Sequence, residues 1–274
     1  MRHESPVTLA GVPETALITL YSRGTEARRP GGLIDDRLAA GLLASIDYPF
    51  AERFGRPDLS HVLRALLFDH QVRGFLQEHP RGTVVALGEG LETQLWRVDN
   101  GGARWISVDL PEIIDLRRRL LPAHPRNQLV PCSALDPAWT ALAGPGTPTL
   151  IVAQGLLMYF TEPEVDGFFD MVAGRCPGST MVFDTIPAWA ATSAGHRQSR
   201  SYRMPPQPWG AGRRRVLRIS RWHRGISDVR IVPPPRGRGL GWGILYPAAT
   251  RLPGLRGLLP QTVMAITGLS GRPS

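Results

Sequence analysis

Two glycines and an aspartate in the first half of the sequence have types and spacing that suit a nucleotide site. Gly88 and Gly90 follow an apolar run in VVALGEGLETQ (residues 84–94), and Asp109 lies 21 residues after Gly88, at the end of a second apolar run. Such glycines let a ligand approach the backbone, and an acid about 20 residues later can bind ribose hydroxyls. The third glycine of the dinucleotide fingerprint is absent. The pattern therefore favours an adenosine cofactor without a pyrophosphate, such as S-adenosylmethionine, over NAD or ATP.

Five short apolar runs have the spacing of strands in an α/β sheet, and the glycines and the aspartate fall at the ends of the first two. Each run is too short for a buried helix and rich in β-branched residues, which favours buried parallel strands. Helical patterns lie between them, as in residues 111–121 and 161–175. Alternating strands and helices predict a doubly wound, mostly parallel sheet. The five predicted strands are residues 82–88, 103–109, 127–132, 149–155 and 180–185.

The rest of the chain is expected to surround this sheet in a single α/β domain, since 274 residues with 42% hydrophobic content can form one large core. Residues 187–224 are rich in Arg, Pro and Trp, fit neither helix nor strand period, and predict an irregular lid over the carboxyl ends of the strands. Residues 228–233 and 261–269 predict late strands at the sheet edge, one of them antiparallel, with a helix between. The predicted organisation is an N-terminal helical cap (1–81), a cofactor-binding core (82–186), a lid or substrate insertion (187–227) and a C-terminal sheet edge (228–274).

Three ordered blocks resemble those of the leucine carboxyl methyltransferase family of class I methyltransferases. The blocks are LGEGLETQLWR, VDLPEIIDLRRRLLP and AQGLLMYFTEPEV, against family patterns L-G-x-G-L-D-T-R, V-D-x-P-E and A-E-G-x-x-x-Y-L. The resemblance covers roughly residues 15–190 and is strongest to a bacterial branch of polyketide O-methyltransferases. It implies a Rossmann-like fold, with S-adenosylmethionine as methyl donor and S-adenosylhomocysteine as product.

The resemblance also implies roles for single residues. Arg64, upstream of the first predicted strand, matches the arginine that binds the methionyl carboxylate of the cofactor. Gly88 and Gly90 would let the methionine portion approach, and Asp109 would hold the ribose hydroxyls. Without the resemblance, Gly88 and Gly90 could form a plain turn, Asp109 could cap a helix, and Arg64 could lie on a solvated helix face.

The sequence departs from the family at several cofactor positions. Gln154 replaces the acid after the fourth strand, so an amide takes the place of a group that could pair with an ammonium. Ala134 replaces an aspartate that contacts adenine, which leaves the backbone of Leu135 as the contact carried over. Arg23 or Arg28 takes the place of an N-terminal lysine, with Arg23 as the candidate.

Few other residues suggest chemistry. His196 and His223 lie in the predicted lid and are candidate catalytic bases, although lone histidines are more often surface residues. Tyr202, Trp209 and Trp222 could line an aromatic acceptor pocket or pack in the core. No cysteine or histidine spacing suggests a metal site.

The basic residues are unevenly distributed. All 32 are arginine, which indicates GC-rich codons, yet residues 1–190 carry 17 Arg and 22 acids while residues 191–274 carry 15 Arg and one acid. A net charge of +14 in the last third favours an anionic substrate, an acidic protein partner or nucleic acid. We expect Arg213, Arg214 and Arg215 to close over the methyl end of the cofactor and recruit a negatively charged acceptor, free or on an acyl carrier protein. The alternative is a solvated basic face.

The sequence thus predicts an S-adenosylmethionine-dependent O-methyltransferase of a small, anionic, aromatic secondary metabolite of polyketide type, acting at a carboxylate. A carboxylate is ionised at neutral pH and needs no general base, whereas a phenol would need one or a nearby cation. A peptide C-terminal carboxyl methyltransferase, a phenol or hydroxyl O-methyltransferase and a nucleic-acid-binding protein or RNA methyltransferase remain alternatives. Two cysteines and no apolar run of 18 residues predict a soluble protein of the cytoplasm, without disulfides or membrane contact.

Overall fold

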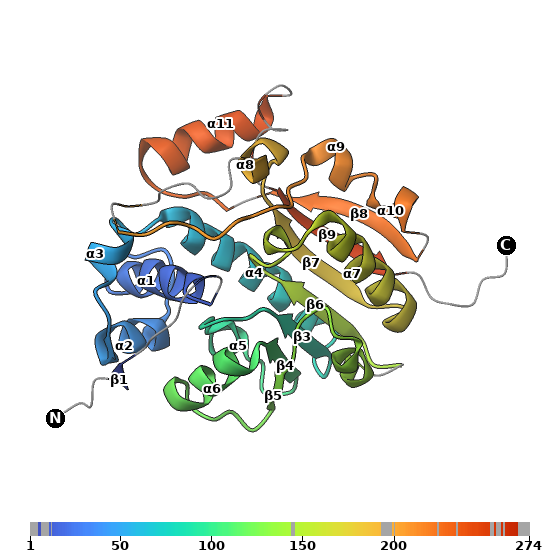
Figure 1. Cartoon of the computed structure of the whole chain (residues 1–274), viewed down its shortest axis with the longest axis horizontal. Coiled ribbons are helices and arrows are strands. Elements are labelled where there is room, and N and C mark those ends of the chain that lie inside the picture. Colours follow the sequence, from blue (N-terminus) through green and yellow to red (C-terminus); the bar gives the residue numbers. More distant parts are fainter. Residues whose placement is uncertain are drawn as a thin grey trace, which may run out of the picture.

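A seven-stranded sheet with the order β5-β4-β3-β6-β7-β9-β8 organises the computed structural model (Figure 1). The described residues are 5–6, 11, 13–143, 146–192, 199, 201–223, 225–233, 235–252, 255, 259 and 261–267. The strands are β3 (Thr83–Leu87), β4 (Arg104–Asp109), β5 (Asn127–Pro131), β6 (Thr149–Ala153), β7 (Thr180–Thr185), β8 (Ile226–Val232) and β9 (Gln261–Thr267).

The sheet has the predicted mostly parallel arrangement. The first five of these strands pair in parallel, and every residue of the central strands β3 and β6 is buried. Burial on both faces explains their continuous apolar runs. Strand β9 pairs antiparallel with both β7 and β8, so it is the predicted late antiparallel strand.

Two hydrophobic layers cover the two faces of the sheet, because successive side chains of a strand point to opposite sides. Val85 and Leu87 of β3 pack in the layer that contains α7 (Glu162–Arg175). Val84 and Ala86 pack in the layer that contains α4 (Leu59–Glu78) and α5 (Gln94–Val98). Helix α6 (Pro111–Leu120) follows β4 and has the expected proline at its start.

The N-terminal region is helical, as predicted. It contains α1 (Thr15–Ala27), α2 (Arg37–Ser45) and α3 (Phe50–Phe54), and a short parallel pair of β1 (Ser5–Pro6) with β2 (Ile46–Asp47). Helix α1 packs against both α2 and α4. The N-terminal helices therefore stand beside the carboxyl ends of the central strands, where a ligand would enter.

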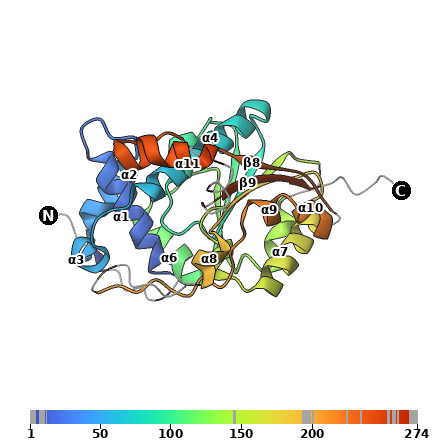
Figure 2. The same ribbon diagram turned by 90° about the horizontal axis from the view of Figure 1, so that it is seen from above.

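Two segments of the last third complete the fold. The first contains α8 (Ala188–Thr192), an extended stretch, α9 (Arg213–Val216) and α10 (Ile219–Trp222), which agrees with an irregular insertion. The second runs between β8 and β9 and contains a π-helical turn, η3 (Leu240–Leu245), and α11 (Tyr246–Arg251). It reaches back to the N-terminal helices (Figure 2), where the Arg238 guanidinium pairs with Glu26 of α1. In the part of the chain that the structure describes, no helix is long and apolar enough to cross a membrane.

Candidate active site

A cavity of about 680 Å³ lies at the carboxyl ends of the central strands. Its walls come from α1, α4, the loops after β3, β4, β5, β6 and β7, and both segments of the last third. A cavity of this size at this edge of an open sheet is the expected place for a small-molecule ligand. Its lining includes Thr15, Thr19, His61, Arg64, Gly88, Gly90, Glu92, Asp109, Ser133, Gln154, Asp184, Met204, Gln207, Arg213, Trp242 and Tyr246.

The loop after β3 requires its two glycines. Gly88 and Gly90 have φ angles of +59° and +56°, a conformation that other residues rarely adopt. A Cβ atom on Gly88 would lie 2.6 Å from Leu156 Cδ1, and one on Gly90 would lie 3.0 Å from Ala16 Cβ. The backbone of this loop therefore forms a wall of the cavity that only glycine can form.

Asp109 lies at the end of β4 and lines the cavity, as its predicted role requires. Its Oδ2 accepts a hydrogen bond from the Gly90 N–H (2.7 Å), and its Oδ1 accepts one from the Leu110 N–H (2.8 Å). Burial raises the pKa of this carboxyl, and the two backbone donors oppose that shift. Each carboxylate oxygen can accept more than one hydrogen bond, so Asp109 can still accept bonds from ribose hydroxyls.

A buried arginine, Arg117, binds the backbone of the glycine loop. Arg117 is 1% exposed; its Nη1 donates to the carbonyls of Gly90 (2.7 Å) and Glu92 (3.0 Å), and its Nη2 lies 2.8 Å from Glu89 Oε2. In the sequence, Arg117 is only one of three consecutive basic residues near the end of the helix predicted over residues 111–121. Its loop-holding contacts join residues more than 20 positions apart, so local sequence gives no signal for them.

Glu92 connects the loop to a buried ionic network. Arg23 Nη1 lies 2.9 Å and Arg97 Nη1 lies 2.7 Å from its carboxylate. Burial disfavours the charge, but these two guanidiniums outweigh it and hold the pKa of Glu92 below its usual value. Arg23 also pairs with Asp36 and is not among the described residues that line the cavity, so it reaches the cavity only through Glu92. Arg28 is exposed and donates to a carbonyl of α2.

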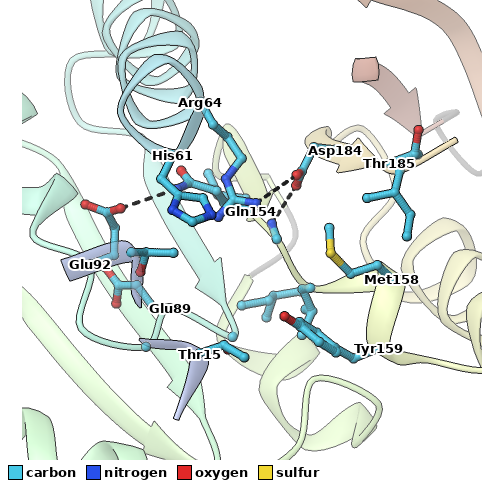
Figure 3. A pocket seen from close by; sticks show the side chains of 18 of the residues that line it. Thr15, His61, Arg64, Glu89, Glu92, Gln154, Met158, Tyr159, Asp184 and Thr185 are labelled. Atoms are coloured by element: carbon cyan, nitrogen blue, oxygen red, sulfur yellow. Dashed lines mark hydrogen bonds and ion pairs between the residues drawn. The ribbon is translucent and has the colours of Figure 1, made fainter. Parts of the chain in front are cut away.

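Gln154 follows β6 and lines the cavity beside Glu92 (Figure 3). Its Nε2 donates to Glu92 Oε2 across 3.3 Å, which orients the amide. Its Oε1 is buried and has no hydrogen-bond partner in the described residues. An oriented acceptor beside a carboxylate suits an ammonium group even though Gln154 itself is neutral.

Arg64 projects from α4 toward the carboxyl ends of β6 and β7. Its Nη1 donates to Asp184 Oδ2 at 3.3 Å (Figure 3), and the same aspartate accepts the N–H of Gly155. The guanidinium lies so close to Gly155 that a Cβ there would be 2.8 Å from Arg64 Nη1. Arg64 thus has a fixed position in the cavity wall, and its other donors remain for a ligand carboxylate.

The loop after β5, which contains the predicted adenine contact Leu135, meets the cavity through other residues. Ser133 and Ala134 line the cavity, while Leu135 is not among its described lining residues. The Leu135 N–H already donates to Ser133 Oγ at 3.1 Å. The loop after β5 therefore presents Ser133 and Ala134 to a ligand.

Several residues assigned to the acceptor pocket lie in the core instead. Tyr202 and Trp209 are each 3% exposed and are absent from the described cavity lining. Tyr202 packs edge-on against Phe54, and Trp209 belongs to the hydrophobic layer on the α7 side. Both side chains therefore pack in the core, which was the alternative interpretation of Tyr202 and Trp209. The side chain of Trp222 lies outside the described residues.

Of the two candidate histidines, His223 is described by the structure and is not among the described residues that line the cavity. His223 is 5% exposed, and its Nδ1 lies 2.7 Å from Asp170 Oδ1 of α7. Its ring packs against Phe169, between α7 and α10. These contacts describe a structural histidine. His196 lies outside the described residues.

The three consecutive arginines point in three directions. Arg213 lines the cavity, Arg214 is exposed, and Arg215 pairs with Glu162 of α7. Of the three, only Arg213 is among the described cavity residues, because successive residues at a helix start project about 100° apart.

A large part of the cavity wall is apolar. Trp242 and Tyr246, from the segment between β8 and β9, lie against each other with ring centroids 4.7 Å apart and line it. The sequence predicted only that this segment belongs to the C-terminal sheet edge. The signal that could have indicated a cavity wall was the pair of aromatic residues four positions apart. Other apolar residues of this wall are Leu156, Met158, Tyr159, Phe160, Met204 and Ile231.

Comparison with known proteins agrees with the geometry. A family model described as leucine carboxyl methyltransferase matches residues 16–173. The tetracenomycin polyketide synthesis O-methyltransferase TcmP of Streptomyces glaucescens is 32% identical over 77% of this chain and 79% of its own length. The S-adenosyl-L-methionine-dependent methyltransferase dpfgK of Gibberella zeae is 31% identical over 58% of this chain and 59% of its own. The solved structure of small RNA methyltransferase HEN1, 13% identical, covers 76% of this chain and 26% of its own with a TM-score of 0.51, a likeness of fold alone.

The sheet and the cavity at its carboxyl edge define a class I, S-adenosylmethionine-dependent methyltransferase. The chain belongs to the leucine carboxyl methyltransferase family. The cavity residues fit this cofactor, because the glycine loop leaves room at the backbone, Asp109 can accept from ribose, and Gln154 Oε1 is an unpaired acceptor. Within the described residues, no group of three or more His, Cys, Asp or Glu could hold a metal ion.

Proposed function

We propose that this enzyme transfers a methyl group to the carboxylate of a small aromatic or otherwise largely apolar secondary metabolite of polyketide type. The observation that carries the proposal is Arg213. Arg213 lines the cavity, and its guanidinium has no hydrogen-bond or ion-pair partner among the described residues. An unpaired cation facing apolar walls suits an acceptor with an apolar body and one anionic group.

The shape of the site supports a small acceptor. Met204, Gln207 and Arg213 line the cavity from one covering segment, and Trp242 and Tyr246 line it from the other. Because two segments contribute to the walls of the same cavity, a small acceptor fits this arrangement better than a protein C-terminus, which would need an open groove. The relative TcmP carries a name that assigns it to polyketide synthesis, which supports the same substrate class.

The proposed reaction needs little acid–base catalysis by the protein. S-adenosylmethionine supplies an electrophilic methyl group when bound. An acceptor carboxylate is already ionised at neutral pH, so the chain must bind it, align it and exclude water. Arg213 would hold the anion; because methylation removes that charge, the neutral ester would lose the ion pair and be released more easily.

A panel of acceptors tests this proposal. Purified protein is incubated with methyl-labelled cofactor and either aromatic carboxylic acids or matched phenols that lack the carboxylate. We expect transfer to the acids, with a product whose label is released as methanol by mild alkali. Label that resists alkali and appears only with phenols would contradict the carboxylate proposal. It would favour a phenol O-methyltransferase, in which Arg213 would stabilise the phenolate.

An acceptor with two carboxyl groups could be delivered on an acidic acyl carrier protein, with one carboxyl group in the thioester to the carrier and the other free as the carboxylate that is methylated. Arg214 is exposed next to Arg213, so it is available to an acidic surface at the cavity. Faster methylation of a carrier-bound acceptor than of the free acid, with the gain lost at high salt, would support this delivery. Equal rates would contradict it.

A further inference from the structure

His61 lines the cavity, and neither the proposed acceptor site nor the predicted cofactor contacts include its side chain. It lies on α4 one turn before Arg64 and lines the cavity beside Gln154 (Figure 3). Residues three apart on a helix share a face, so His61 and Arg64 face the same part of the cavity. This part lies at the carboxyl end of β6, beside Glu92 and Gln154.

The hydrogen bonds of Ser22 favour one tautomer of His61. Ser22 is 2% exposed; its Oγ accepts the N–H of Asp58 (3.2 Å) and lies 3.1 Å from His61 Nδ1. Among the described residues, His61 Nδ1 is the one possible acceptor within hydrogen-bond distance of this hydroxyl, which favours donation from Ser22 to Nδ1. With Nδ1 accepting, the neutral ring carries its proton on Nε2, the nitrogen away from Ser22.

The ring is neutral at physiological pH. Burial and the neighbouring charge of Arg64 lower the pKa of His61 to about 4. A neutral imidazole can stand next to a guanidinium without charge repulsion and still donate a hydrogen bond to an anion.

We propose that His61 donates its Nε2–H to the cofactor carboxylate that Arg64 binds, which makes it a second ligand of the amino acid end of S-adenosylmethionine. The inference rests on the cofactor-dependent function proposed above. Two donors from one helix face, one charged and one neutral, would define both the position and the rotation of the carboxylate. This orientation in turn directs the methyl group toward the acceptor.

Two ligands that differ in the carboxylate test the proposal. S-adenosylhomocysteine carries the amino acid end, and 5′-methylthioadenosine has the same adenosine and sulfur without it. By calorimetric titration, His61→Leu should weaken binding of S-adenosylhomocysteine about tenfold, the loss of one hydrogen bond to a charged group. Binding of 5′-methylthioadenosine should change less than about twofold. His70→Leu, at an exposed position of the same helix, is the matched control and should change neither.

Two polar variants distinguish the effect of the lost hydrogen-bond donor from the effect of the changed side-chain shape on ligand binding. His61→Gln can place an amide N–H near the position of Nε2 and should recover most of the lost affinity. His61→Asn places its amide near Nδ1 and should bind as weakly as His61→Leu. The comparison of His61→Gln with His61→Asn also tests the proposal if His61→Leu fails to fold.

The possible outcomes are distinct. Equal loss of both ligands in His61→Leu and in His61→Asn would overturn the inference, since His61 would then only shape the pocket. Unchanged S-adenosylhomocysteine binding with a raised acceptor KM would also overturn it. Failure of the wild-type protein to bind S-adenosylhomocysteine would instead refute the proposed function.

Discussion

The backbone N–H of Gly90 donates a hydrogen bond to Asp109 Oδ2 across 2.7 Å, which joins residues 19 apart in the sequence. The glycine loop after β3 and the acid at the end of β4 are therefore one structural unit. Because the same carboxylate orients the loop and faces the cavity, its loss removes two features of the cofactor site at once.

Asp109→Ala should weaken binding of S-adenosylhomocysteine by about 1.5–3 kcal/mol, since a charged acceptor for ribose and for Gly90 is lost. Calorimetric titration measures the change, and circular dichroism checks that the fold remains. Asp115→Ala, on the exposed side of α6, is the control and should bind as wild type. Unchanged affinity in the Asp109 variant would show that the ribose lies elsewhere.

Arg64→Ala should weaken binding of the same ligand by about 1.5–3 kcal/mol, because a charged hydrogen bond to the methionyl carboxylate is removed. The affinity for 5′-methylthioadenosine, which lacks that carboxylate, should stay close to wild type. Arg56→Ala, at an exposed position just before α4, controls for the loss of one positive charge. A similar loss for both ligands would argue against a contact with the carboxylate.

Arg213→Gln should raise the acceptor KM about tenfold or more and leave S-adenosylhomocysteine affinity unchanged, since only Arg213 of the three arginines lines the cavity. The neighbouring Arg214→Gln removes the same charge from an exposed side chain and should leave the KM for a free acceptor unchanged. Steady-state kinetics at low salt compare the two. Equal effects of both variants would mean that net charge, and not the position of Arg213, recruits the acceptor.

Gly88→Ala should destabilise the protein by about 1–3 kcal/mol, because its φ is +59° and a Cβ would lie 2.6 Å from Leu156. Gly74→Ala is the matched substitution in α4, where a Cβ meets nothing within 4 Å. It should stabilise the helix by up to about 1 kcal/mol. Urea denaturation of both variants measures the difference; two equal values would show that the loop can relax.

The stability of the wild-type protein should fall between pH 6.5 and pH 4 in a way that His61→Gln does not share. The folded pKa of His61 is about 4, while an unfolded histidine titrates near its ordinary value of 6.5. Between these values the unfolded state binds more protons, so the contribution is complete above pH 6.5 and decreases as the pH falls.

Urea denaturation at pH 7 and pH 5 tests this difference, which should reach up to about 2 kcal/mol. Arg64 and Arg23 oppose protonation of His61, while Asp58 favours it. Other groups titrate in both proteins and cancel in the comparison. Parallel loss of stability in wild type and His61→Gln would show that the ring is solvated enough to protonate freely.

Much of the fold follows from patterns that are local in the sequence. The runs at residues 82–88 and 149–155 form the central strands β3 and β6, because a strand buried on both faces must be apolar throughout. The positions of Gly88, Gly90 and Asp109 at the cavity also follow, since parallel strands bring their carboxyl ends to one edge of the sheet.

Which side chains reach the cavity could not be predicted from these local patterns. Arg213 and Arg215 are two residues apart and of the same type, yet one faces the cavity and the other pairs with Glu162, because a helix turns its residues around an axis. His61 and Trp242 reach the same cavity from segments 181 positions apart. The sheet and the pairing of the glycine loop with Asp109 could be predicted from periodicity and spacing along the chain. The surroundings of the cavity depend on helix rotation and long-range packing, which composition and spacing along the chain do not encode.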